Sequence, residues 1–328
     1  MKTRTINKIL TAKTNDWIES IDHKELRKLL KKDIVITGGS IASMLLQEPV
    51  NDYDIYISNV TTLAMLVEYY VKDFNKEHGE GTAFIVHHSD TYEDDDRDPN
   101  EPHQRLYDTE HSLSGLYGCL KEGDRIEIGL ESGIGMVASN EEENSHDAAN
   151  EEQGKYRTVF LSSNAITLSD KIQIIVRFYG DHKEIHSNFD FVHARNWWTL
   201  ETGVVLNVKS MECLMSRELI YSGSKYPLAS LFRTRKFIIR GWRCPISNFI
   251  KMAVQLNEFD LKNIHVLREQ LTGVDALYCK ALINACQTKV NCEGSDFELG
   301  ADYMCEVIEK VMENQESDEE NAENSENG

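Results

Sequence analysis

Two aspartates separated by one residue stand in the stretch DYDIYI, residues 52–57. Successive side chains of a β-strand point to opposite faces, so Asp52 and Asp54 are predicted to project from one face and Tyr53 from the other. Two carboxylates side by side repel each other unless a cation lies between them. Hard oxygen ligands of this kind suit Mg²⁺ or Mn²⁺, so the stretch predicts a divalent metal site.

Two glycines lie shortly before this pair, in IVITGGS. The apolar run 34–36 predicts a buried strand, and the residues from Ser40 onward predict a short helix. Gly38 and Gly39 allow a sharp turn and a close approach to the backbone. Free amides at a helix N-terminus attract anions, and Ser40 adds a hydroxyl, so the turn predicts a phosphate site.

The spacing of the two features strengthens both interpretations. Twelve residues, Ser40 to Asn51, separate the turn from the aspartates. That length allows two helical turns and a return, so that the two strands can lie side by side. A nucleoside triphosphate bound to Mg²⁺ needs an anion site next to a metal site, and we therefore expect the two features to act together.

The segments TGGSIASMLL and NDYDIYI resemble the Gly-Gly-x and Asp-x-Asp signature of polymerase beta-like nucleotidyltransferases. They are most similar to the head domain of poly(A) polymerases and CCA-adding enzymes, although residues 41–43 differ from the Val-Arg-Asp often found there. The resemblance implies transfer of a nucleoside monophosphate from an NTP to an acceptor hydroxyl, with release of pyrophosphate. An RNA 3′ end is the first acceptor to expect. Transfer to a protein or small molecule, and a non-catalytic nucleotide- or RNA-binding module, are the alternatives.

The resemblance also implies a third acid on a neighbouring strand, which would assist the attacking hydroxyl or hold metal. Asp190, between two phenylalanines, fits that form and is the preferred candidate, as a catalytic residue and metal ligand beside Asp52 and Asp54. Glu127, between two isoleucines, is the alternative.

A basic segment, residues 224–245, supplies candidate phosphate contacts. If it is helical, Arg233, Lys236 and Arg240 share a face, because they are three and four residues apart. The segment resembles the one that joins head to neck in poly(A) polymerases and CCA-adding enzymes. Lys225, Arg233 and Lys236 are therefore predicted, with Gly38, Gly39 and Ser40, to bind the nucleotide.

The pattern of apolar residues predicts an α+β fold, with a mixed sheet and flanking helices followed by an all-helical C-terminal domain. The resemblance implies that the mixed sheet is a nucleotidyltransferase palm. The predicted divisions are an N-terminal helix (1–31) packing on the head, the head itself (32–210), a helical domain (211–312) and a disordered acidic tail (313–328). Further predictions are one helix at 15–31 and strands at 125–130, 158–161, 172–179 and within 187–198.

The charge is concentrated in three segments. The net charge is −20, and residues 89–101, 139–153 and 313–328 together hold −19 of it, so the remaining chain is nearly neutral. We expect the first two to be acidic insertions in the head. The seven cysteines include no CxxC pair, and no apolar run is long enough to span a membrane, which favours a cytoplasmic protein.

Overall fold

The computed structural model describes residues 1–328 apart from 89–119, 131–134, 138–154, 272–275, 294–299 and 311–328. The predicted acidic insertions and the acidic tail lie wholly in these ranges, outside the described residues. The chain forms two compact units, Met1–Ser216 and Arg217–Gly328, and each is described by itself.

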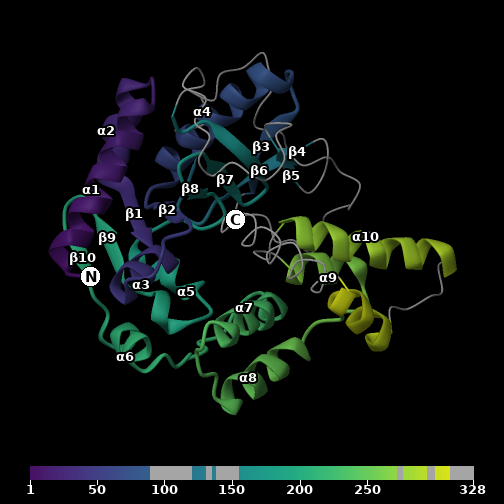
Figure 1. The fold of residues 1–328 in the computed structure, drawn as a ribbon. Coiled ribbons are helices and arrows are strands. Elements are labelled where there is room, and N and C mark those ends of the chain that lie inside the picture. Colours follow the sequence, from purple (N-terminus) through teal and green to yellow (C-terminus); the bar gives the residue numbers. More distant parts are fainter. Residues whose placement is uncertain (89–119, 131–134, 138–154, 272–275, 294–299, 311–328) are drawn as a thin grey trace, which may run out of the picture. The chain divides into compact units, whose positions relative to one another are not determined.

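Unit 1 is a mixed sheet with helices, as Figure 1 shows. Its helices are α1 (Thr3–Ser20), α2 (Lys24–Asp33), α3 (Gly39–Leu46), α4 (Val60–His78), α5 (His182–Ser187) and α6 (Val208–Ser216), with the short 3₁₀ helix η3 (Val192–Ala194). Its strands are β1 (Ile34–Thr37), β2 (Tyr53–Ile57), β3 (Ala83–His88), β4 (Arg125–Leu130), β5 (Gly135–Val137), β6 (Thr158–Ser162), β7 (Ala165–Leu168), β8 (Ile172–Ile175), β9 (Trp197–Thr199) and β10 (Gly203–Val205).

The main sheet has the strand order β10-β9-β1-β2-β8-β7-β6-β5, and β3 and β4 pair separately. β1 and β2 are antiparallel, with Ile36 opposite Ile55. β8 lies on the other side of β2 and runs parallel to it, with Asp54 beside Gln173. The strand with the aspartates is therefore central, between the strand of the glycine turn and a strand from much later in the chain.

The two faces of this sheet differ in character. Ile36, Ile55 and Ile174 point to one face and are fully buried in the main core, with apolar residues of α1, α2 and α4. On the other face, Val35 and Tyr56 form a small cluster with Ile185 of α5. Toward the glycine turn, this second face of the sheet carries polar residues instead of apolar ones. The candidate site therefore lies on the face that other residues cover less.

Unit 2 consists of helices α7 (Pro227–Ile239), α8 (Ile246–Leu256), α9 (Ile264–Gln270) and α10 (Ala276–Glu293), with residues 301–310 also helical. The predicted fold class, a mixed α+β sheet followed by a run of helices, is confirmed. Within the described residues, no helix combines the length and apolar character that crossing a bilayer requires.

Three sequence-based predictions of elements are wrong. Residues 15–31 do not form one helix, because the chain is extended at Ile21 and a new helix starts where His23 Nδ1 accepts from Leu26 N (3.1 Å). The strand predicted at 172–179 ends at Ile175. The segment 187–198 contributes only its last two residues to a strand, and Phe189 and Asp190 lie in a loop.

Candidate active site

The turn between β1 and α3 is held in a conformation that requires glycine. Gly38 has φ +94°, a backbone region that favours glycine. A Cβ built on Gly38 would also come within 3.0 Å of Asp54 Oδ2. The Asp54 carboxylate therefore lies directly against the turn, which is the juxtaposition that the sequence predicted for the metal and phosphate sites.

The aspartate pair lies at the start of β2. By the register of β1 and β2, Asp54 stands opposite Thr37, while Asp52 immediately precedes the strand and is exposed. Burial, with a further contribution from the charge of Asp52, raises the pKa of Asp54 to about 7. An ionised pair is thus costly at this place unless a cation compensates it, which fits a divalent metal ion held by Asp52 and Asp54.

The first residues of α3 suit an anion. Gly39 is exposed, and a Cβ added to it would meet nothing within 4 Å. Ser40 Oγ is buried and has no hydrogen-bond partner among the residues that the structure describes. Buried hydroxyls are normally satisfied, so this one stands out as a polar group at the turn whose hydrogen bond is not made within the described residues. The helix N-terminus adds its unpaired amides and its dipole.

The segment 186–196, which runs from the end of α5 through η3, holds the turn by hydrogen bonds. Thr37 is fully buried, its Oγ1 lies 2.8 Å from His186 Nε2, and it donates to the Asn196 carbonyl at 2.8 Å. Gly38 N donates to the Ala194 carbonyl at 3.1 Å. These contacts join residues about 150 positions apart in the chain. Sequence reasoning missed them, because nothing local to His186 or Asn196 reveals their partner.

Asp190 does not stand where the sequence-based prediction placed it. It lies in a bend rather than on a strand, and its charge acts on His193 and Arg195, whose pKa values are lowered mainly by burial. Among the described residues, no group of three or more His, Cys, Asp or Glu side chains could hold a metal ion. The structure therefore does not bring Asp190 together with Asp52 and Asp54 in such a group.

Glu127, the alternative third acid, is engaged elsewhere. It lies on β4, which pairs with β3 and belongs to no strand pair of the main sheet. Its Oε1 lies 3.1 Å from Arg125 Nε and 3.8 Å from Arg177 Nη1. These two cations neutralise the carboxylate, and β4 does not neighbour β2, so Glu127 stands apart from the aspartate pair.

The predicted basic contacts belong to unit 2. Arg233 and Lys236 lie on α7, which confirms that this stretch is helical, and Lys225 precedes the helix and is exposed. Pro227 begins the helix, where its missing N–H costs nothing. Unit 1 alone builds the glycine turn and the aspartate pair, so these three basic residues remain a prediction about nucleotide binding.

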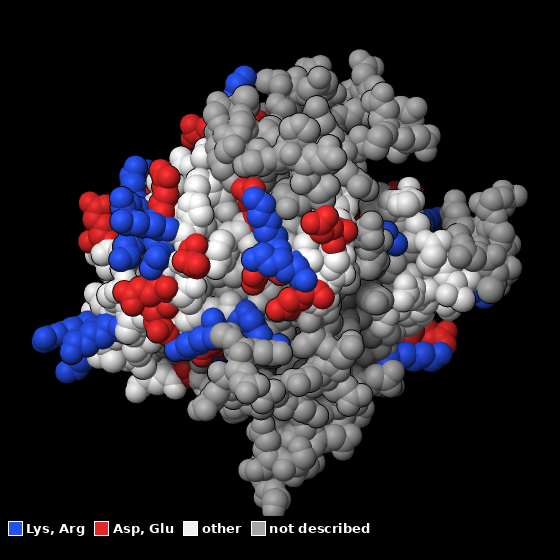
Figure 2. Space-filling view, turned by 90° about the horizontal axis from the view of Figure 1, so that it is seen from above, with Lys and Arg blue, Asp and Glu red and all other residues white. Residues whose placement is uncertain are grey.

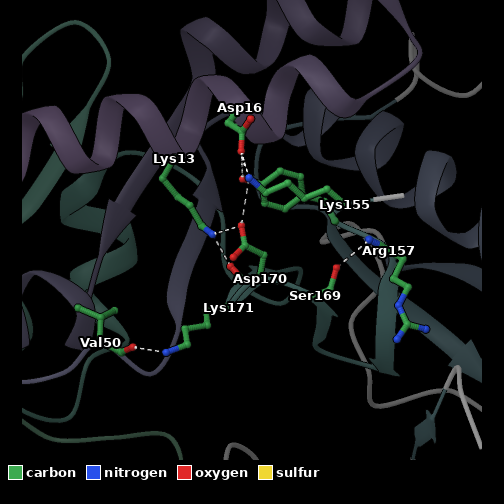
Figure 3. Close-up of polar contacts among 9 residues, drawn as sticks. Lys13, Asp16, Val50, Lys155, Arg157, Ser169, Asp170 and Lys171 are labelled. Atoms are coloured by element: carbon green, nitrogen blue, oxygen red, sulfur yellow. Dashed lines mark hydrogen bonds and ion pairs between the residues drawn. The ribbon is translucent and has the colours of Figure 1, made fainter. Parts of the chain in front are cut away.

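Ion pairs anchor the approach to β2 (Figure 3). Lys13 of α1 lies 2.5 Å from Asp170 Oδ2, and Lys155 lies 2.5 Å from Asp16 Oδ2 and 3.7 Å from Asp170. Asp170 and Lys171 form the turn between β7 and β8, both with positive φ. The Lys171 carbonyl accepts from Tyr53 N at 2.7 Å. The network thus fixes this turn against α1, and the turn fixes the backbone between the two aspartates.

The surface charge is mixed on one face of the molecule. Figure 2 shows Lys and Arg side chains interleaved with Asp and Glu side chains on the face that it presents. A nucleic acid would need a continuous basic patch for strong non-specific binding. The described residues on this face do not offer one.

A sequence model of the Gabija anti-defense 2 family matches residues 8–217, nearly all of unit 1. No curated protein matches the chain. Two solved structures are similar to it in fold. The CCA-adding enzyme of Bacillus stearothermophilus in complex with CTP has 10% identity and a TM-score of 0.33, over 80% of this chain and 50% of that one.

The second similar structure is the CCA-adding enzyme of Thermotoga maritima complexed with tRNA, with 12% identity and a TM-score of 0.34, over 84% of this chain and 54% of that one. The chain thus spans about half the length of each of these two proteins.

Proposed function

The chain belongs to the Gabija anti-defense 2 family, and from this membership and the site in unit 1 we propose that it opposes Gabija defence as a metal-dependent nucleotidyltransferase. It would transfer a nucleoside monophosphate from an NTP to an acceptor hydroxyl and release pyrophosphate. The anti-defence role comes from the family description, and the reaction comes from the chemistry of the site.

One observation carries the reaction. The Asp54 carboxylate lies so close to Gly38 that a Cβ there would be 3.0 Å from Oδ2, and burial, with the charge of Asp52, raises the pKa of Asp54 to about 7. A cation at the pair would neutralise a charge that the site otherwise disfavours, and it would lie next to the amides that suit phosphate. This arrangement serves a metal-bound triphosphate better than either part alone.

The chain's own groups have distinct parts in this reaction. Asp52 and Asp54 would hold Mg²⁺ or Mn²⁺, which supplies neutralisation of phosphate charge and polarisation of the acceptor hydroxyl. The amides of Gly39 and Ser40, with the Ser40 hydroxyl, would bind the β- and γ-phosphates. The acceptor oxygen forms a bond to the α-phosphorus, the bond from that phosphorus to the pyrophosphate oxygen breaks, and the hydroxyl proton leaves to solvent. Positioning and charge neutralisation would supply most of the rate.

The acceptor we propose first is an RNA 3′ end, on the resemblance of residues 37–57 to poly(A)- and tRNA-modifying enzymes. Arg233 and Lys236 on α7, with Lys225 before it, would then contact phosphates. A protein or a small molecule is the alternative acceptor.

Incubation of the full chain with each α-labelled NTP, Mg²⁺ and total cellular RNA and protein tests the reaction. We expect label in one macromolecular fraction, pyrophosphate release, and a loss of both by about a hundredfold or more in an Asp52→Asn/Asp54→Asn variant. Asp22→Asn, in an exposed loop of the same unit, is the matched control and should retain full labelling. Labelling by the double variant at the wild-type rate would refute the mechanism.

A non-catalytic nucleotide-binding module is a second candidate, and one observation favours it. The described residues hold no cluster of three or more His, Cys, Asp or Glu side chains that could bind a metal ion, so they bring no third acid to the aspartate pair. This candidate predicts tight, Mg²⁺-dependent NTP binding that requires Asp54, with neither pyrophosphate release nor label transfer.

The link between the site and the family role has its own test. In cells that carry Gabija, expression of the wild-type chain should relieve defence, and the Asp52→Asn/Asp54→Asn variant should fail to do so at equal protein abundance. Relief by the double variant equal to that by wild type would separate the anti-defence role from the site.

A further inference from the structure

The strand next to β2 brings an uncharged side chain to the place where a third acid was expected. β8 runs parallel to β2, and its Gln173 is the register partner of Asp54. Register partners on neighbouring strands point to the same face of a sheet. On β7, the next strand, Thr167 is the register partner of Gln173. A row of polar residues, Thr37, Asp54, Gln173 and Thr167, therefore crosses four strands on one face.

This row lies on the less buried face of the sheet. Ile55, Ile172 and Ile166, which point to the opposite face, are at most 1% exposed. Asp54, Gln173 and Thr167 are all partly exposed. The Gln173 side chain makes no hydrogen bond within the part of the chain that the structure describes. A partly buried amide beside a carboxylate and without a protein partner is available to whatever the carboxylate binds.

The rest of β8 brings no acid to the pair either. Lys171 precedes the strand in the strained turn, and its carbonyl accepts from Tyr53 N, which places Lys171 beside Asp52. Lys171 Nζ donates to the Val50 carbonyl at 3.4 Å, so its charge lies near the approach to β2 (Figure 3). The neighbours of the aspartate pair on this side are thus one cation and one neutral amide.

We propose that Gln173 is the third side chain of the metal site, its amide oxygen coordinating the divalent cation that Asp52 and Asp54 hold. The inference rests on the proposed function, since it assigns a ligand within the same site. Amide carbonyl oxygens are hard donors and coordinate divalent cations beside carboxylates. With this ligand the site carries two negative charges instead of three, and so it binds the cation more weakly than a three-acid site would.

The affinity of such a site for a divalent cation depends on the number of its charged ligands. The proposal therefore predicts the direction in which each substitution changes that affinity. Gln173→Glu should tighten Mn²⁺ binding by roughly tenfold, because a carboxylate replaces a neutral oxygen of nearly the same reach. Gln173→Leu should weaken binding by about fivefold, because it removes the oxygen and keeps a similar volume. An ordinary surface position would show neither change.

Mn²⁺ titration of the full chain, followed by electron paramagnetic resonance of the free ion, measures these affinities without any reaction. The controls are Gln287→Glu, the same substitution on a partly exposed residue of α10 in unit 2, and thermal unfolding of every variant. We expect Gln287→Glu to bind Mn²⁺ like wild type. If Gln173→Glu lowers the melting temperature, Gln173→Leu alone still tests the ligand.

The outcomes distinguish this inference from the proposed function. Tighter binding by Gln173→Glu and weaker binding by Gln173→Leu support the ligand. If Asp54→Asn abolishes Mn²⁺ binding while both Gln173 variants stay within twofold of wild type, Gln173 is not a ligand and the proposed function stands. If wild type and Asp54→Asn bind Mn²⁺ equally, the metal site itself is absent, and both proposals are overturned.

Discussion

Replacing the Asp54 carboxylate with an amide should stabilise the cation-free protein, and the gain should depend on pH. Burial and the neighbouring Asp52 raise the pKa of Asp54 from 3.8 to about 7. Folding therefore disfavours the ionised form, which the unfolded chain adopts freely above pH 3.8. The wild-type protein loses stability as the pH rises from about 4 to 7, and Asp54→Asn removes that loss.

The magnitude follows from the size of the shift. A change from 3.8 to about 7 corresponds to roughly 4 kcal/mol, at about 1.4 kcal/mol per pKa unit. The difference in free energy of unfolding between Asp54→Asn and wild type should be small near pH 4 and grow by about 1.4 kcal/mol per pH unit. Above pH 7 the folded state is ionised as well, and the difference should level off.

Urea denaturation at pH 5, 6, 7 and 8 in the presence of EDTA, followed by tryptophan fluorescence, measures this difference. Added Mg²⁺ should stabilise wild type and leave Asp54→Asn unchanged, because only the pair binds the cation. Asp181→Asn is a control for which the expected change in stability has the opposite sign. Hydrogen bonds from Glu184 and Lys183 backbone amides lower the pKa of Asp181, so its replacement should cost stability above pH 4.

Equal pH dependence for wild type and Asp54→Asn would refute the reasoning. The carboxylate would then be hydrated in the folded protein and could not lie against Gly38 as the structure has it. The proposed metal site depends on that contact, so it would lose its main support.

Further predictions concern the turn, a buried histidine and the ion-pair network. Gly38→Ala should destabilise unit 1 by about 2 kcal/mol or more, because φ is +94° and the Cβ would meet Asp54, whereas Gly39→Ala should have little effect; urea denaturation compares them. Burial lowers the pKa of His193 from 6.5 to about 4, so the folded state keeps it neutral and stability falls by up to about 1.4 kcal/mol per unit as the pH drops from 6.5 to 4. His193→Leu should reduce that acid sensitivity in the same assay, and an unchanged pH profile would contradict it. Lys155→Ala should change the free energy of unfolding by less than about 1 kcal/mol, because the pair with Asp16 is exposed; a larger loss would show that the network is structural.

The part of the fold that was predictable from the sequence is local. The run from Ile34 to Ile57 contains a buried strand, a glycine turn, a short helix and an alternating strand, and each has its own signal in consecutive residues. That the two strands lie side by side follows from the short connection between them. Their antiparallel direction does not, because a helical connection of this length also suits a parallel pair. The sequence was therefore enough to predict that Gly38 and Asp54 lie close together, although it could not predict the distance between them.

The segment around Asp190 was mispredicted for a physical reason. Phe189 and Phe191 alternate with Asn188 and Asp190 as in a strand. The backbone donors and acceptors of the segment, however, form η3 and hold the glycine turn. Short apolar runs are ambiguous between a strand and a packed loop, because burial alone does not decide the backbone. In this protein the segment forms a loop, because its carbonyl oxygens accept hydrogen bonds from Gly38 N and Thr37 Oγ1.

Gln173 illustrates the limit of motif reasoning. Its own sequence context, KIQII, predicts a strand and nothing more. Its importance arises from the parallel register with β2, which joins residues about 120 positions apart. A search of the sequence for a third acid does not find Gln173, because its side chain is uncharged. Its position beside Asp54 is known only from the register of the sheet.

The parallel pairing of β2 with β8 has a consequence for how the protein acquires its site. Ile57 at the end of β2 and Ile172 at the start of β8 are far apart in the chain. Most of unit 1 must therefore be synthesised before β8 can pair with β2. Loop-closure entropy grows only with the logarithm of loop length, about 0.6 kcal/mol per doubling. Relatives could therefore vary the intervening stretch widely in length at little thermodynamic cost, while the nascent chain would carry an unpaired strand edge until late in folding.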